Sequence, residues 1–241
     1  MVKQLEYSNI RIPDGVFTRQ QLLEENAQAG MKATQMRHAL EKLTASGRII
    51  RVGHGKYSAD KAKPTYIGNY SDKAILTAQI INNDMFWLDF RVWELSWLNE
   101  FLNHQLTPGY VFVETERDGT EFAFDLIAEH YHGEVLLRPT IDDLLRYGTD
   151  GTIVVKSLFS SPPPSGPETY HVGLEKIVVD MFTERLLRDL LPRGDYPEAL
   201  HDMFTRYSVN QVSMMRYARR RGRENEIREF LRDKSSIKLY V

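Results

Sequence analysis

The sequence predicts an α+β protein, in which an N-terminal winged helix-turn-helix precedes a mixed α/β domain with a helical C-terminal part. Three observations favour this fold class. Two amphipathic helical patterns and a glycine-centred hairpin follow one another between Phe17 and Tyr57. Strand and helix patterns then alternate as far as residue 156, as expected for a sheet covered by helices. After the proline-rich stretch at residues 160–166, the patterns are helical.

The first helical pattern begins at Thr18. Gln21, three residues further on, completes a capping box, which satisfies free backbone N–H groups at a helix start. Leu22 and Leu23 supply the apolar stripe, and Gly30 ends the segment because a left-handed residue is easiest for glycine.

The second helix is expected over residues 33–46. Its apolar positions recur at three- and four-residue spacing and therefore share one buried face: Met36, Ala39, Leu40 and Leu43. Its polar positions lie largely off that face: Thr34, Gln35, Arg37, His38, Glu41 and Lys42. A strand at residues 48–52, a turn at 53–55 and a return strand from residue 56 form the hairpin. Residues 16–17 are expected to add a short strand to it.

This order of elements indicates contact with double-stranded DNA. A recognition helix fits the major groove, where its outer side chains reach base edges. Basic wing residues would lie along phosphates, which position a protein without reading sequence: Arg51, His54 and Lys56. The polar, net-basic outer face of the second helix supports this interpretation, and Glu41 on the same side argues against it. The alternative is a winged helix used for protein contact.

The composition permits two domains, which we assign to residues 1–63, the DNA-binding domain, and 64–241, a regulatory α/β domain that ends in helices. The chain has 241 residues, with 42% hydrophobic and 27% charged residues. It contains no cysteine, as is common in a reducing cytoplasm. No apolar run approaches the roughly 18 residues of a membrane helix, and the N-terminus lacks a signal-peptide core. A cytoplasmic protein without membrane contact is therefore expected.

Charge is unevenly distributed along the chain. Residues 1–63 hold 11 basic and 6 acidic residues, a net charge of +5. Residues 64–205 hold 10 and 23, a net charge of −13, and residues 206–241 hold 10 and 4, a net charge of +6. Basic ends suggest two surfaces for anionic partners. The acidic middle would be repelled by DNA and is expected to face away from it.

The second basic segment is an arginine-rich helix. Val212, Met215 and Ala218 form an inward stripe. The candidates for a second anionic contact, to phosphates or to a partner, are Arg216, Arg219, Arg220 and Arg223. The same arginines, together with Arg221, could instead be neutralised within the fold by the acidic middle. Both interpretations stay open at the level of sequence.

No pattern of residues points firmly to catalysis. There is no cysteine ligand, no histidine pair at metal spacing, no glycine-rich phosphate loop and no nucleophile elbow. Asp89 and Glu114 lie on predicted strands and could hold magnesium in a nuclease. A lysine two residues beyond the acid would strengthen this alternative, but position 116 is Glu. We therefore expect no enzyme, no metal and no cofactor.

Further elements are expected in the second domain. The predicted strands are residues 86–93, 110–115, 135–137 and 152–156. The predicted helices are residues 95–106, 121–131, 173–191, 197–207, 209–221 and 224–233, together with a helix that is capped by Thr140. Phe122 is expected to point inward from the helix at residues 121–131.

Two segments resemble a known family. Leu174–Phe182 reads LEKIVVDMF and Arg216–Gly222 reads RYARRRG. In combination with the winged helix and the α/β domain, they resemble the AbiEi-type antitoxins of bacterial type IV toxin–antitoxin systems. The resemblance implies a cytoplasmic DNA-binding antitoxin and autorepressor, paired with a nucleotidyltransferase-like toxin. The sequence carries no signal for an oligomeric state.

The resemblance also implies roles for individual residues. By position, the groove-facing side chains would be Thr34, Gln35, Arg37 and His38, and the wing would use Arg51 and Lys56. Glu175 and Asp180 match the family helix, where capping or ion-pair roles are expected.

Overall fold

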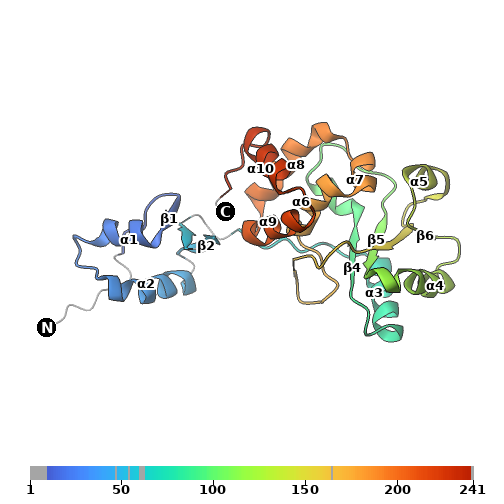
Figure 1. Cartoon of the computed structure of the whole chain (residues 1–241), viewed down its shortest axis with the longest axis horizontal. Helices are drawn as coiled ribbons and strands as arrows, with labels where there is room; N and C mark the ends of the chain where they lie inside the picture. The colour runs from blue at the N-terminus through green and yellow to red at the C-terminus, as the bar shows by residue number, and fades with distance from the viewer. Residues whose placement is uncertain (1–9, 47, 54, 60–62, 164, 240–241) are drawn as a thin grey trace. The chain divides into compact units, whose positions relative to one another are not determined.

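A computed structural model describes residues 10–46, 48–53, 55–59, 63–163 and 165–239 (Figure 1). The chain divides into two compact units. Unit 1 consists mainly of the residues up to Pro64, and unit 2 of residues 65–209 and 213–238. Both units combine helices with a sheet, so the α+β class predicted from the sequence is confirmed.

Unit 1 begins with strand β1, continues with two helices and ends with a hairpin. The elements are β1 (Val16–Thr18), α1 (Arg19–Asn26), α2 (Ala33–Ala45), β2 (Ile50–Gly53) and β3 (Lys56–Ser58). The strands are antiparallel in the order β1-β3-β2, so the short strand expected at residues 16–17 does join the hairpin. Strand β2 starts two residues later than expected.

Local signals explain where α1 begins and how it is held. Thr18 is the N-cap, and the expected capping box with Gln21 is present. Asn26, which the sequence did not single out, is buried at the end of α1. Its side chain accepts from Arg11 N at 2.8 Å and donates to Arg11 O at 2.7 Å and to Leu22 O at 2.9 Å. This amide therefore fastens the preceding chain segment to the helix.

The core of unit 1 gathers around the predicted apolar stripe of α2. Met36, Ala39, Leu40 and Leu43 are all buried, as expected from their spacing. They pack with residues from the other elements of the unit: Ile10, Phe17, Leu22, Met31 and Ile49. Because this face of α2 is buried, the opposite face carries the exposed polar side chains.

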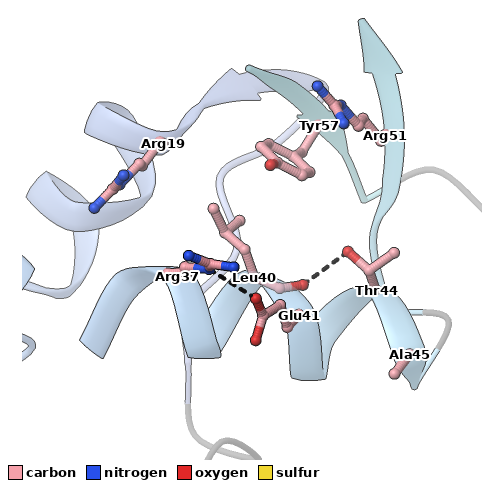
Figure 2. Close-up of a pocket in the computed structure, with 8 residues that line it drawn as sticks. All are labelled: Arg19, Arg37, Leu40, Glu41, Thr44, Ala45, Arg51 and Tyr57. Carbon is pink, nitrogen blue, oxygen red and sulfur yellow. Dashed lines mark hydrogen bonds and ion pairs between the residues drawn. The ribbon is translucent and has the colours of Figure 1, made fainter. Parts of the chain in front are cut away.

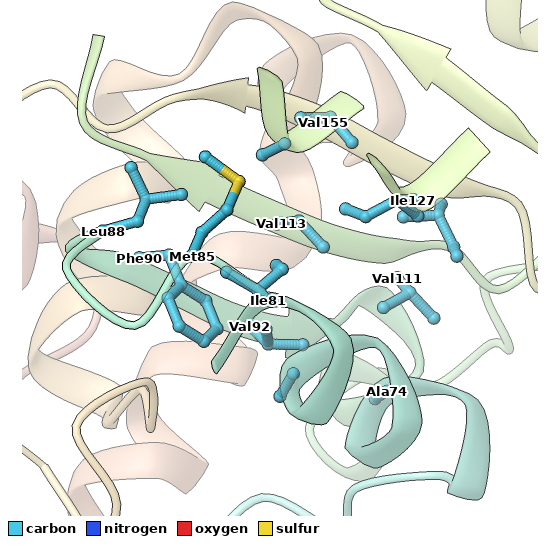
Figure 3. Close-up of a cluster of buried hydrophobic side chains, with 13 residues drawn as sticks. Ala74, Ile81, Met85, Leu88, Phe90, Val92, Val111, Val113, Ile127 and Val155 are labelled. Atoms are coloured by element: carbon cyan, nitrogen blue, oxygen red, sulfur yellow. The ribbon is translucent and has the colours of Figure 1, made fainter. Parts of the chain in front are cut away.

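Unit 2 is built on a mixed sheet. The strands are β4 (Phe90–Glu94), β5 (Val111–Thr115), β6 (Val135–Leu137) and β7 (Ile153–Ser157), in the order β4-β5-β7-β6. Strands β4 and β5 are antiparallel, whereas β7 runs parallel to β5 and β6. Helices α3 (Asp72–Asp84) and α4 (Thr120–His130) pack on one face, through a cluster that includes Ile81, Val113, Ile127 and Val155 (Figure 3).

The remaining helices complete unit 2. They are α5 (Ile141–Tyr147), α6 (Leu174–Thr183), α7 (Arg185–Leu190), α8 (Tyr196–Arg206), α9 (Gln211–Arg220) and α10 (Glu224–Asp233), with 3-10 turns η2 (Leu95–Glu100), η3 (Arg117–Gly119) and η4 (Arg193–Asp195). Lys176 on α6 reaches Glu114 on β5, whose neighbour Val113 faces α3 and α4. Because side chains alternate along a strand, α6 covers the opposite face of the sheet.

Several predicted elements differ from the structure. Only the end of the strand predicted at residues 86–93 forms, because α3 and its closing turn extend to Leu88 and leave Phe86 and Trp87 exposed. The helix predicted at 95–106 is a short 3-10 turn that ends at Glu100. The Phe122 side chain points outward, with 66% of its surface exposed, because Thr120, Ala123 and Ile127 form the inner face of α4.

The helix predicted at residues 173–191 is interrupted at Glu184. The backbone of Glu184 is extended, with ψ of 120°, so α6 ends and α7 begins around it. The Glu184 carboxylate pairs with Lys156 Nζ at 2.9 Å and with the guanidinium of Arg221. Contacts with residues distant in sequence thus accompany the break. Within the described residues, the helices are all too short or too polar to cross a membrane.

Candidate nucleic-acid interface

Helix α2 presents most of the predicted groove-facing side chains to solvent. Thr34, Arg37, His38 and Lys42 are exposed on the side away from the buried stripe. Gln35 is half-buried, and its Oε1 atom accepts from Lys32 N at 3.1 Å. The amide of Gln35 therefore serves as part of a capping box at the start of the helix.

Glu41 lies close to Arg37 and His38 on the exposed face. Arg37 Nε lies 3.0 Å from Glu41 Oε1, and His38 Nδ1 lies 3.7 Å from Glu41 Oε2. The hydrogen bond from Arg37 is the main reason that the pKa of Glu41 is lowered. The negative charge that argued against DNA contact is thus balanced on its own helix by Arg37.

The hairpin carries the predicted wing residues. Arg51 is exposed, and its Nε atom donates to Gly53 O at 3.2 Å. Lys56 is half-buried at the start of β3. The pairing of β2 and β3 shifts by one residue between Arg51 and Gly53, which marks a bulge. His54, the other wing candidate, lies outside the described residues.

A concave surface joins α2 to α1 and the hairpin. Its volume is about 600 Å³ (Figure 2). The residues that line it are Arg19, Arg37, Leu40, Glu41, Thr44, Ala45, Arg51 and Tyr57. Arginines from α1, α2 and β2 thus meet around it, and Glu41 is the carboxylate among these lining residues.

Sequence reasoning identified Arg37 and Arg51 but missed Arg19 and Tyr57. Arg19 directly follows the N-cap Thr18, a position that faces solvent in the first turn of a helix. Tyr57 precedes the buried Ser58 on β3, so its side chain points to the other side of the sheet. The alternation of side chains along a strand could have suggested which side of β3 Tyr57 faces, but the meeting of Arg19 and Tyr57 at one surface depends on how α1, α2 and the hairpin pack.

The exposed arginines at the end of α9 have acceptors within unit 2. Arg219 makes two hydrogen bonds to Glu224, of 2.6 and 3.0 Å, and Arg223 pairs with Glu226 at 3.0 Å. Arg220 donates to the backbone oxygen of Ser161 at 2.7 Å. Arg216 is exposed and has no ion pair among the residues that the structure describes.

Glu114, one carboxylate of the nuclease alternative, is buried. It accepts hydrogen bonds from Trp93 Nε1 and Lys176 Nζ, each at 2.8 Å, and lies 3.5 Å from Lys156 Nζ. Burial opposes its ionisation, but the two lysines outweigh burial and lower the pKa of Glu114 to about 2. Asp89 is exposed and pairs with the arginine two residues further on. The two carboxylates therefore lie in different surroundings.

The ionic network continues from Glu114 into the helical part of unit 2. Lys176 also pairs with Asp180 one turn further along α6. This contact agrees with the ion-pair role that was expected for Asp180. The side chain of Arg221 is only 5% exposed, in contrast to the other arginines of its segment, and it contacts Glu184 and Asp180. Throughout the described parts of the chain, no group of three His, Asp or Glu side chains could hold a metal ion.

The class of protein emerges from comparison with known families. A family model described as "Transcriptional regulator, AbiEi antitoxin" matches residues 10–59, which span the elements from β1 to β3, and confirms the resemblance found in the sequence. A second model matches residues 35–237, and the chain belongs to that family, which is described as "Family of unknown function (DUF6577)". No curated protein matches the chain. The match over residues 10–59 supports a regulator or antitoxin role.

Proposed function

We propose that this protein is a cytoplasmic DNA-binding transcriptional regulator, and that unit 1 is its winged helix-turn-helix. The main observation in support is that α2 buries its apolar stripe and exposes polar and cationic side chains opposite it. The antitoxin-regulator match over residues 10–59 supports the same assignment.

In the proposed complex, α2 lies in the major groove. Thr34, Arg37 and His38 are exposed on the outward side, where side chains of a recognition helix reach base edges. Arginine is suited to guanine because its planar fork donates two hydrogen bonds to O6 and N7. Arg51 and Lys56 on the hairpin contact phosphates and orient the helix.

The proposed physiological role is that of the antitoxin and autorepressor of a toxin–antitoxin pair. The family match supports an antitoxin role, and a nucleotidyltransferase-like toxin is the proposed partner. The acidic residues 64–205, with a net charge of −13, favour a basic partner over DNA for unit 2. Repression requires no catalysis. The buried ion pair between Glu114 and Lys176 supports a role for Glu114 in the fold and not in a nuclease site.

Binding of the full chain to the DNA upstream of its own gene tests this function. Fluorescence anisotropy should show tighter binding to that duplex than to a shuffled one, with affinity falling steeply as salt increases. Arg37→Ala should reduce the discrimination by about 1–3 kcal/mol if Arg37 contacts a base. Arg185→Ala is the matched control, because Arg185 is also exposed and faces an acid four residues further on.

The outcomes separate DNA binding from protein contact. A wild-type chain that binds neither duplex at low salt would contradict the proposal and favour a winged helix used for protein contact. If Arg37→Ala and Arg185→Ala lost discrimination between the two duplexes to the same extent, the base-reading role of α2 would be excluded.

A further inference from the structure

We propose that the concave surface between α1, α2 and the hairpin seats the sugar-phosphate backbone of one DNA strand, held by Arg19, Arg51 and Tyr57. This inference rests on the proposed function and adds to it. It assigns binding roles to Arg19 and Tyr57, and it distinguishes phosphate contacts at the edges of the surface from base reading by Arg37, which lines the same surface.

The cationic side chains come from different elements but border one space. Figure 2 shows Arg19 on α1 at one side and Arg51 on the hairpin at the other, with α2 between and below them. Arg19 donates to Ala33 O at 3.3 Å, and Arg51 donates to Gly53 O at 3.2 Å. A guanidinium has five N–H donors, so each side chain keeps donors for a phosphate while one backbone contact orients it.

Tyr57 supplies a neutral donor between the arginines. Its ring packs on the buried Phe17, with centroids 6.1 Å apart and planes 27° from parallel. Figure 2 shows the ring projecting from β3 into the space between Arg19 and Arg51. Within the described part of the chain, its hydroxyl has no hydrogen-bond partner and is available to a phosphate oxygen. The Phe17 contact fixes the position of the ring.

The charge balance favours an anion in this space. In the free protein Glu41 is paired with Arg37, whereas Arg19 and Arg51 have no ion pair among the described residues. The side chain of Thr44 is also occupied, because its hydroxyl donates to Leu40 O at 2.7 Å. The unbalanced positive charge therefore resides at the two edges of the concavity. Two separated cations fit successive phosphates of a strand better than one small anion.

The position beside α2 identifies the anion as the DNA backbone. If α2 occupies the major groove, a phosphate strand borders that groove alongside the helix. The concavity lies between α2 and the hairpin, where such a strand would pass. Contacts to it would fix the register of α2 without reading bases.

The test measures binding of full-length variants to operator and shuffled duplexes over a series of KCl concentrations. Arg19→Ala and Arg51→Ala should each weaken binding to both duplexes by the same factor. Each should also reduce the slope of log affinity against log salt by about 0.9, the change expected for one lost phosphate contact. Tyr57→Phe should weaken binding with little change in slope, because a hydroxyl releases no counterion.

Controls separate the possible failures. Arg185→Ala should change neither affinity nor slope, and Arg19→Lys should restore most of the slope. Circular dichroism melts of all variants establish that they are folded. Unchanged affinity and slope in both Arg19→Ala and Arg51→Ala, with a wild-type chain that still discriminates operator, would overturn this inference and leave the proposed function intact. Binding of a mononucleotide or inorganic pyrophosphate at this surface, with no duplex binding, would overturn both.

Discussion

At the scale of single residues, Glu41 illustrates how a charge depends on its neighbours. Read in the sequence, it opposes contact between α2 and DNA. In the structure its carboxylate accepts a hydrogen bond from Arg37 at 3.0 Å. Release of Arg37 to a base would expose this negative charge to the phosphates, so Glu41 weakens binding in the proposed complex and restrains Arg37 when the protein is free.

Glu41→Gln should therefore tighten DNA binding. The substitution keeps the size of the side chain, removes its charge and weakens its hold on Arg37. Anisotropy titrations should show several-fold higher affinity for all duplexes, together with a steeper dependence on salt. Weaker binding of Glu41→Gln to the operator alone would contradict this expectation and indicate that Glu41 accepts a hydrogen bond from a cytosine amino group.

Lys176 and Arg185 provide matched ion pairs in opposite surroundings. Each faces an acid four residues further along its helix, but Lys176 and Asp180 are both 1% exposed, whereas Arg185 is 89% exposed. Lys176→Met should destabilise the protein by about 3–5 kcal/mol because it leaves carboxyl groups buried without their partner. Arg185→Ala should cost less than about 1 kcal/mol. Urea unfolding measures both, and a similar cost for the two substitutions would refute this account.

Glu114 should make stability depend on acidity. Its pKa in the folded protein is about 2, below the ordinary value of 4.5. A carboxyl with a lowered folded-state pKa contributes stability above the unfolded value and loses it as the pH falls towards the folded value. Between pH 4.5 and 2, the wild type should therefore lose more unfolding free energy than Glu114→Gln. If the unfolding free energies of the two proteins fell in parallel as the pH decreased, the lysines would not be stabilising the ionised form of Glu114.

At the scale of elements, local patterns predicted the parts that local interactions determine. The capping box at Thr18, the apolar stripe of α2 and the limits of α10 are all present as predicted. Each depends on residues within about one helical turn or on a simple repeat. The concave surface was not predicted: the sequence singled out Arg37 on the helix and Arg51 in the wing separately, and their meeting with Arg19 and Tyr57 depends on how the elements pack.

Contacts between distant residues accompany one difference from the predicted elements, and a local turn accounts for another. Nothing near Glu184 in the sequence interrupts a helix, and its partners Lys156 and Arg221 lie 28 and 37 residues away. Phe86 and Trp87 are typical strand residues but occupy a turn closed by Leu88 N–H to Met85 O. Tertiary contacts override local preference at Glu184, whereas at Phe86 and Trp87 a local turn stands in place of the predicted strand.

Asn26 should anchor α1 within unit 1. Asn26→Ala removes the hydrogen bonds to the backbone of Arg11 and Leu22, and leaves buried polar groups without partners. We expect a loss of about 1–3 kcal/mol in the stability of unit 1. Hydrogen exchange of the α1 and α2 amides reports it, with the exposed Gln28→Ala as control. Equal protection in the two variants would show that Asn26 is dispensable.

At the scale of the whole molecule, charge separates along the chain, with +5 before residue 64, −13 in the middle and +6 after residue 205. Arg221 offsets part of the final excess, because it pairs with Glu184 and Asp180 of the acidic middle. Arg219 and Arg223 pair with Glu224 and Glu226 of α10, which are already counted in the +6. Internal neutralisation thus accounts for these arginines, and Arg216 is the better candidate for an external anionic contact.

Charge reversal at Arg216 and Arg219 should separate these roles. Arg216→Glu should leave the melting temperature nearly unchanged and weaken binding to DNA or to an acidic partner. Arg219→Glu should instead lower the melting temperature, because it turns an ion pair with Glu224 into a repulsion. Calorimetry and anisotropy on the same samples compare them. Unchanged affinity in Arg216→Glu would leave this segment without a binding role.

The buried network of unit 2 also has an evolutionary consequence. The carboxyl groups of Glu114, Asp180 and Glu184 face the basic groups of Lys156, Lys176 and Arg221 across strands and helices. Replacement of one member would leave a group of opposite charge without its partner. The network can therefore be lost in evolution only when several of its members are replaced together. Relatives of this chain should therefore show covariation among these positions, and the rare lineages that lack one member should carry apolar residues at its partners.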